Sequence, residues 1–233
     1  MNKIERVRAV LRGEKPDRVP AGFWFHYPGT LTAEETAAEH IKLFRETDMD
    51  IIKIMQDFSY PLTGTITRAS DWRHIRFGGV DAKEFEKPKE IISRILDETG
   101  GEALTLMTMF GPFKAASFAF GDEELMFWAK EAPEDVAEGI KIIADGMTEW
   151  LQGYLDLGVD GLYYTAQFAE PGRFTLEQWE TLVKPFDEQV LSVCRDREEK
   201  INFLHMCGEP EYRFRVDLQR LRAMPGDIVN WSV

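Results

Sequence analysis

The chain has 233 residues, of which 44% are hydrophobic and 30% charged, and its 41 acidic and 28 basic side chains give a formal net charge of −13. This length allows one sizeable hydrophobic core, and we expect a single domain over residues 1–233. A surface with such an excess of negative charge repels phosphate backbones, which argues against a nucleic-acid partner.

The sequence shows no sign of a targeting or membrane segment. Residues 1–20 carry charges throughout and lack the apolar stretch of a signal peptide. No window approaches the ~18 uninterrupted apolar residues of a membrane span. Cys194 and Cys207 are too few for a disulfide framework. We therefore expect a protein of the reducing cytoplasm.

Apolar periodicity and turn residues predict helices and strands that alternate along most of the chain. Thr32 and Glu35 form a capping box at the start of one helix, and Pro185 is expected to bend another. Alternation within residues 65–77 predicts a hairpin excursion. The predicted strands are 21–25, 50–56, 103–110, 161–168, 201–206 and 227–233. The predicted helices are 2–12, 32–46, 89–100, 122–130, 133–157, 175–198 and 211–223.

Six of these strands are apolar, bounded by turns and separated by helices, which indicates an α/β fold of parallel βα units. A closed (β/α)8 TIM barrel needs eight strands in roughly 250 residues. We therefore predict a barrel of this type that is incomplete after about six strands.

Polar residues follow several predicted strands, where a parallel barrel carries its active site. They either form a site or are the ordinary polar ends of strands in a soluble protein. Asp57 is a candidate catalytic residue, because a carboxylate at this rim can accept a proton or stabilise positive charge; it can equally cap its own loop. The candidate substrate-binding residues are His26, Tyr27, Gln167 and Glu170.

His205-Met206-Cys207-Gly208 ends the predicted strand at 201–206. Residues i and i+2 of a strand project to the same face, and imidazole and thiolate are ligands that zinc prefers. The pattern alone also fits a packed core histidine and cysteine. Two ligands are one fewer than a catalytic zinc site normally takes from the protein. Cys194, in the middle of a predicted helix, is more typical of an ordinary buried cysteine.

Three segments resemble the uroporphyrinogen decarboxylase superfamily. The first is RVRAVLRGEKPDRVP, a helix followed by an Asp-Arg-x-Pro turn, and the second is FGPFKAASF, similar to the family's Gly-x-Pro-aromatic segment. The third is YLDLGVDGLYYTAQFAEPGRFTLEQWETLVKPF, similar to a family strand and the helix with a Pro-aromatic pair. The likeness extends over nearly the whole chain in the family's order and implies a (β/α)8 barrel.

The true decarboxylases of this superfamily carry an Arg-Gln-Ala-Gly-Arg segment whose arginines bind the carboxylates of the substrate. The corresponding residues here are Phe25-His26-Tyr27-Pro28-Gly29, which lack both cations. The family's tyrosine after the Gly-x-Pro segment is replaced by Phe118. Asp57 does lie where the resemblance places the family's aspartate.

The cobalamin-dependent methyltransferases of the superfamily are similar to this chain at His205-Met206-Cys207-Gly208. In that branch the histidine and cysteine bind zinc, and a third ligand, often cysteine, comes from near the last strand of the barrel. Zinc lowers the pKa of a bound thiol, which then accepts a methyl group from methyl-cobalamin on a corrinoid protein. Relatives that demethylate methoxylated compounds run the transfer towards the cobalamin. The third ligand has no counterpart here.

The resemblance implies a zinc-dependent methyltransferase that exchanges a methyl group between a small molecule and a corrinoid protein, with His205 and Cys207 as ligands. One alternative is uroporphyrinogen decarboxylase, a lyase of porphyrin biosynthesis, with Asp57 stabilising the protonated pyrrole. A second is a non-catalytic binding or assembly fragment. The missing strands leave three possibilities open: truncation, completion by another chain, or pairing with a second copy as a homo-oligomer that covers the sheet edges.

Overall fold

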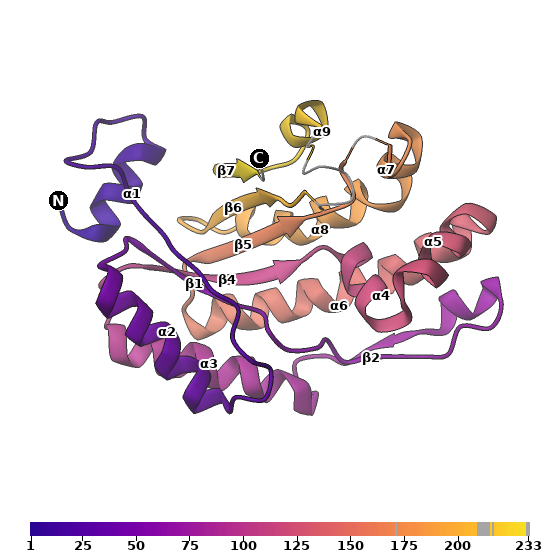
Figure 1. Cartoon of the computed structure of the whole chain (residues 1–233), viewed down its shortest axis with the longest axis horizontal. Helices are drawn as coiled ribbons and strands as arrows, with labels where there is room; N and C mark the ends of the chain where they lie inside the picture. Colours follow the sequence, from indigo (N-terminus) through magenta and orange to yellow (C-terminus); the bar gives the residue numbers. More distant parts are fainter. Residues whose placement is uncertain (171, 209–214, 216, 232–233) are drawn as a thin grey trace.

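A single parallel sheet organises the molecule, a computed structural model that describes residues 1–170, 172–208, 215 and 217–231. Its strand order is β1-β4-β5-β6-β7, and every neighbouring pair is parallel (Figure 1). These strands are β1 (Ile51–Ile54), β4 (Leu104–Phe110), β5 (Gly161–Ala166), β6 (Ile201–Met206) and β7 (Ile228–Trp231). The sheet is a half-barrel, which confirms the predicted α/β fold of the barrel type.

The predicted strand at 21–25 is wrong, and the sheet therefore has five strands rather than six. The segment is extended, but its one backbone hydrogen bond to the strand region joins the Asp50 amide to the Ala21 carbonyl at 2.7 Å. A strand needs hydrogen-bonded partners along its length, and no described segment supplies them beyond Ala21. Phe23, Trp24 and Phe25 are accordingly exposed rather than buried.

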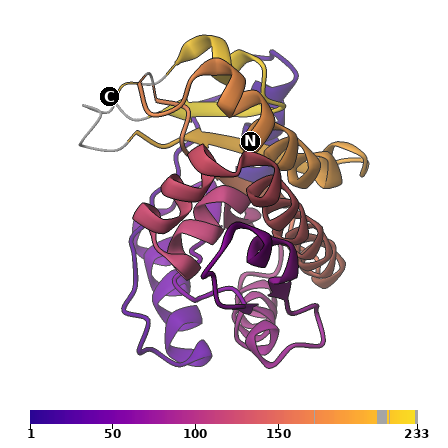
Figure 2. The ribbon, with the colours of Figure 1, turned by 90° about the vertical axis from the view of Figure 1, so that its right-hand side faces the viewer.

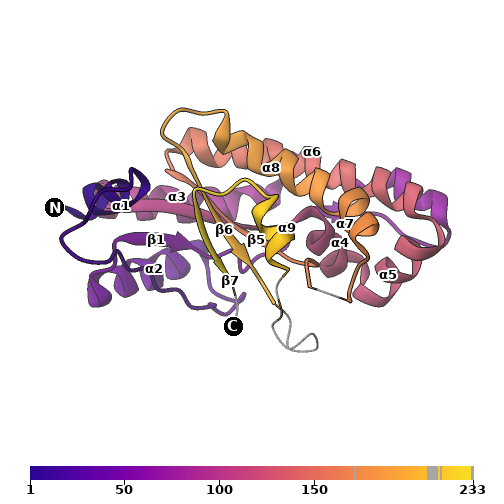
Figure 3. The same ribbon diagram turned by 90° about the horizontal axis from the view of Figure 1, so that it is seen from above.

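Helices pack on the outer face of the sheet and enclose the main hydrophobic core. Seen from above, α6 and α8 run along one side of the strands, while α2 lies near β1 on the other side of the view (Figure 3). The helices are α1 (Lys3–Leu11), α2 (Ala33–Thr47), α3 (Lys83–Thr99), α4 (Pro112–Phe120), α5 (Asp122–Glu131), α6 (Pro133–Leu157), α7 (Leu176–Leu182), α8 (Lys184–Arg195) and α9 (Leu218–Arg222). Within the described residues, no helix is long and apolar enough to span a membrane.

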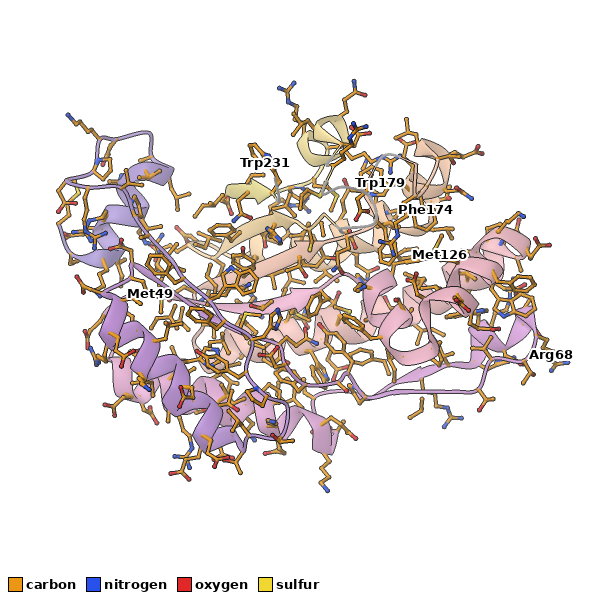
Figure 4. The ribbon with its side chains drawn as sticks, in the orientation of Figure 1. Met49, Arg68, Met126, Phe174, Trp179 and Trp231 are labelled. Carbon is orange, nitrogen blue, oxygen red and sulfur yellow. The ribbon has the colours of Figure 1, made fainter. Side chains whose placement is uncertain are left out.

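Local sequence signals account for several of these boundaries. Thr32 and Glu35 form the predicted capping box of α2. The helix predicted to bend at Pro185 is divided into α7 and α8 at Val183. The hairpin excursion is also present: β2 (Leu62–Thr63) pairs antiparallel with β3 (Arg76–Phe77) around a 3-10 helix, η1 (Ala69–His74). Figure 4 shows Arg68 at the far end of this excursion.

Several predicted elements differ in extent; the helix predicted at 89–100, for example, begins at Lys83. α4 is a helix to which the sequence pattern assigned no element; Pro112 occupies its first turn, where a missing amide hydrogen costs nothing. Of the helix predicted at 211–223, the structure describes α9, while residues 211–214 and 216 lie outside the described residues. The predicted last strand is described as β7, without residues 232 and 233.

The inner face of the sheet has a smaller core that α1 covers at its base. Val7 of α1 packs there with inward side chains of four strands, including Leu106 and Ile201. The buried carboxylate of Asp50 fixes this arrangement. It accepts hydrogen bonds from the Ala21 amide at 2.8 Å and from Arg18 at 2.6 Å, and it also binds Arg6 of α1.

Asp17 completes the network, because its carboxylate binds the Arg6 guanidinium at 2.6 and 2.9 Å. Asp17 and Arg18 are the first two residues of the Asp-Arg-x-Pro turn. The turn therefore ties α1 and the chain after it to the beginning of β1.

Asp50→Asn is expected to lower the free energy of unfolding by about 3 kcal/mol, because it leaves the positive charge of Arg6 buried with less compensation. Burial alone raises the pKa of Asp50, but the Ala21 amide and the two arginines lower that pKa overall. The contribution should therefore be present at neutral pH and lost as the pH falls through the lowered pKa. Chemical denaturation measures it.

The exposed Asp97 of α3 offers a matched control. Asp97→Asn should unfold at the wild-type midpoint. Equal midpoints for Asp50→Asn and Asp97→Asn would show that the network does not stabilise the fold.

Candidate functional site

Polar side chains gather on the inner face of the half-barrel, above the part that α1 covers. They come from β1, β5, β6 and β7, which the parallel register brings side by side. His205 pairs in register with Thr165 of β5 on one side and with Asn230 of β7 on the other. Strands that are far apart in the sequence thus place one imidazole between two polar neighbours.

Asn230 orients His205. The Nδ1 atom of His205 lies 2.7 Å from Oδ1 of Asn230, and because an amide oxygen only accepts, Nδ1 carries the proton. Nε2 is then the nitrogen with a lone pair. Burial lowers the pKa of His205 and the charge of Lys53 lowers it further, while the Asn230 hydrogen bond raises it; the net shift is downward. His205 is therefore neutral at physiological pH.

Cys207 follows β6 on the same side as His205. Its backbone amide donates to the Ala166 carbonyl at 2.9 Å, which continues the ladder between β5 and β6 beyond the strand. The alternation of a strand then directs residues 205 and 207 to one face. Both side chains interact electrostatically with Lys53.

These two donors do not make a complete metal site by themselves. Across residues 1–170, 172–208, 215 and 217–231, no three His, Cys, Asp or Glu side chains come close enough together to hold a metal ion.

Lys53, like Tyr163 and Asn230, is an inner-face residue that the sequence pattern does not single out. Its side chain is 6% exposed, and its ammonium lies 3.9 Å from the ring centroids of both Trp24 and Tyr163. Burial lowers its pKa to about 7, although Asp57 and Cys207 oppose the shift. The available signal was a lysine within the otherwise apolar strand Ile51–Ile54. Helical or strand periodicity does not show which face such a lysine occupies.

Asp57 and His26 meet at the end of β1. Asp57 Oδ1 lies 2.6 Å from Nδ1 of His26, and its Oδ2 accepts the backbone amide of Tyr27 at 2.8 Å. Asp57 therefore fixes residues 26 and 27, which follow the segment 21–25, at the carboxyl end of β1. The ring of Tyr27 packs against His40 of α2, with centroids 4.6 Å apart, and so faces the helix layer.

A cavity of about 560 Å³ opens at this rim, and His26 and Asp57 both line it. Figure 2 looks onto this end of the molecule, with α4 and α5 in front and the hairpin excursion below them. Most of the remaining wall is apolar or aromatic, with Tyr60 from the loop after β1, Phe110 from β4 and Phe118 from α4. Such a cavity suits a small organic molecule held by a few polar groups.

Gln167 and Glu170 follow β5 and are both buried, but neither belongs to the wall of this cavity. The Oε1 atom of Gln167 has no hydrogen-bond partner in the described structure. Glu170 lies 3.7 Å from the guanidinium of Arg173, which stacks over Phe168. Glu170 thus takes part in the packing of its own loop.

His40, His74 and Cys194 do not line the rim cavity. His40 is buried, with Nδ1 on the Thr36 carbonyl at 2.8 Å and Nε2 accepting the Met55 amide at 3.0 Å. His74 is exposed, and Cys194 is buried within α8.

Comparisons with known proteins give one family model and a set of solved structures. The family model described as uroporphyrinogen decarboxylase (URO-D) matches residues 62–230. No curated protein sequence matches the chain. A methyltransferase from Methanosarcina mazei superposes with a TM-score of 0.69 at 15% identity, covering 92% of this chain and 72% of that chain. A protein assigned as vitamin-B12-independent methionine synthase from Listeria monocytogenes gives 0.48 at 12% identity, covering 75% of this chain and 54% of that one. At 15% identity the first of these structures shows a shared fold.

Lys53→Met is expected to stabilise the protein at neutral pH. Unfolded Lys53 has its ordinary pKa of 10.5, whereas burial lowers the pKa to about 7 in the folded state. Between these values the unfolded chain binds more protons, so wild-type stability rises with pH and the cost of burying the charge is complete below about pH 7. In thermal unfolding, the excess of the variant's Tm over that of the wild type should be largest below about pH 7 and should narrow towards alkaline pH.

The exposed Lys42 of α2 provides the control, and Lys42→Met should have the Tm of the wild type across this pH range. The titratable groups that face Lys53 are present in both proteins: Asp57, Tyr163, His205 and Cys207. A difference in Tm between Lys53→Met and the wild type that stays constant with pH would contradict the lowered pKa of Lys53.

Proposed function

The chain belongs to the uroporphyrinogen decarboxylase family, and from this premise we propose that it is a methyltransferase that exchanges a methyl group between a small molecule and a corrinoid protein. His205 and Cys207 are its zinc ligands in this proposal. The resemblance at His205-Met206-Cys207-Gly208 leads to it, and the barrel fold shared with the Methanosarcina methyltransferase is consistent with it.

The observation that carries the proposal is the hydrogen bond by which Asn230 fixes the tautomer of His205 at the end of β6, with Cys207 two residues further along the same ladder. A metal-binding histidine commonly donates its second ring N–H to an oxygen acceptor, which orients the ring and leaves the other nitrogen for the metal. The Asn230 oxygen does this for His205 at 2.7 Å. A histidine must also be neutral to bind a metal, and the lowered pKa of His205 keeps it so.

The donor set fits zinc as a pair of ligands rather than as a full site. Nitrogen and sulfur are the donors that zinc prefers, but a catalytic site normally takes three from the protein. The third ligand in this proposal comes from outside the described residues or from another molecule. When bound, zinc would lower the pKa of a thiol or polarise an oxygen of the substrate.

The chain's own residues then have separate tasks. Asn230 holds His205, while His26 and Asp57 contact the substrate in the rim cavity. Gln167 offers a buried amide oxygen after β5. Tyr27 and Glu170 act indirectly, by fixing the position of the rim and of the loop after β5.

His205→Ala and Cys207→Ala are each expected to reduce bound zinc to background, because each removes one of two donors. Elemental analysis of the purified, folded proteins measures the stoichiometry. The exposed His74 and the buried Cys194 supply controls, so His74→Ala and Cys194→Ala should retain wild-type zinc. Equal zinc in the wild type and both site variants would end the proposal.

Decarboxylation of a porphyrinogen is a second candidate, favoured by the description of the matching family and by Asp57 in the wall of the rim cavity. Asp57 would stabilise positive charge on a pyrrole. The test is the formation of coproporphyrinogen from uroporphyrinogen by the purified protein, with Asp57→Asn expected to abolish it. Absence of product from the wild type would remove this candidate and leave the zinc proposal untouched.

A further inference from the structure

A second cavity, of about 330 Å³, lies on the inner face of the half-barrel, away from the rim cavity. α1, the segment 19–24 and strands β1, β5, β6 and β7 enclose it. Its walls are largely apolar, and they include Val7, Leu11, Phe23, Trp24 and Phe203. The unpaired segment 21–25 leaves this space between itself and the strands, since it follows β1 only at Ala21.

Lys53 is the charged side chain in the wall of this cavity. In the described structure its ammonium makes neither a hydrogen bond nor an ion pair, and it rests between the faces of Trp24 and Tyr163. The side chain is 94% buried, as its exposed fraction of 6% implies. A buried ammonium without an anionic partner is costly, and ring faces compensate only part of that cost.

The carboxylate that acts electrostatically on Lys53 is already bound to other groups. Asp57 and Cys207 both affect Lys53 electrostatically, but the two oxygens of Asp57 bind His26 and the Tyr27 amide. The amide of Asn230, also in the cavity wall, lies 3.5 Å from the Tyr163 hydroxyl through Nδ2. The cavity thus combines an apolar wall with the Lys53 ammonium and the Asn230 amide. A ligand that complements this wall would be apolar and carry a negative charge.

We propose that this inner cavity binds a small organic acid, whose carboxylate pairs with the Lys53 ammonium while its apolar body packs between Trp24, Tyr163 and the residues of α1. The volume lies at the lower end of the usual range for small-molecule sites, so it suits a single ring or a short chain. The flat faces of Trp24 and Tyr163 favour an aromatic body. This binding needs no metal and goes beyond the methyltransferase proposal.

Benzoate and its neutral isostere benzamide test the proposal directly. In calorimetric titrations, the wild-type protein should bind benzoate at least tenfold more tightly than benzamide. Lys53→Met should lose this preference, lowering benzoate affinity at least tenfold while leaving benzamide affinity unchanged. Lys42→Met, at an exposed site, should bind both compounds as the wild type does.

Three results would overturn the proposal: no benzoate binding by the wild type at millimolar concentration, equal affinities for the two compounds, or unchanged benzoate affinity in Lys53→Met. If Lys53→Met fails to fold, the comparison of benzoate with benzamide on the wild type still decides. Zinc analysis of Lys53→Met separates this inference from the methyltransferase proposal, because the variant should keep its zinc. Loss of benzoate binding with zinc retained supports the acid-binding cavity alone.

Discussion

The buried carboxylate of Asp50 is the point on which the arrangement of the inner face depends. It binds Arg6 of α1, Arg18 of the following turn and the amide of Ala21. α1 is thereby placed over the base of the sheet, and the chain leaves Ala21 in the direction that brings Trp24 over Lys53. The ion-pair network at the beginning of β1 thus positions both α1, which closes one side of the inner cavity, and Trp24, which forms another.

The two faces of the sheet have different tasks. The outer face is hydrophobic and stabilises the fold through its helices. The inner face changes along the strands from an apolar base to a polar layer that contains Lys53, Tyr163, His205 and Asn230. Because strand alternation assigns each residue to one face, this layer can change its chemistry without disturbing the helix layer. The rim residues His26 and Asp57 form a hydrogen-bonded pair beside this layer, and the His26 ring makes an edge contact with Trp24, with centroids 5.4 Å apart.

Much of the architecture follows from local signals, because capping boxes, proline positions and alternating strands act over a few residues. The boundaries of α2 and the break between α7 and α8 are of this kind. The strand expected at 21–25 shows the limit, since strand formation depends on a partner that composition does not reveal. At the site, the pairing of His205 and Cys207 on one face follows from spacing, whereas the aromatic surroundings of Lys53 depend on Trp24 and Tyr163, which are remote in sequence.

The strand order of the sheet, β1-β4-β5-β6-β7, is also the order in which these strands occur along the chain. Each strand therefore docks on the edge left by the strand made just before it, and no strand has to insert between two that are already joined. Loop closure is limited to one connection at a time, which keeps its entropic cost low. During translation the sheet can thus grow in one direction as successive βα units leave the ribosome, with its helix layer laid down alongside.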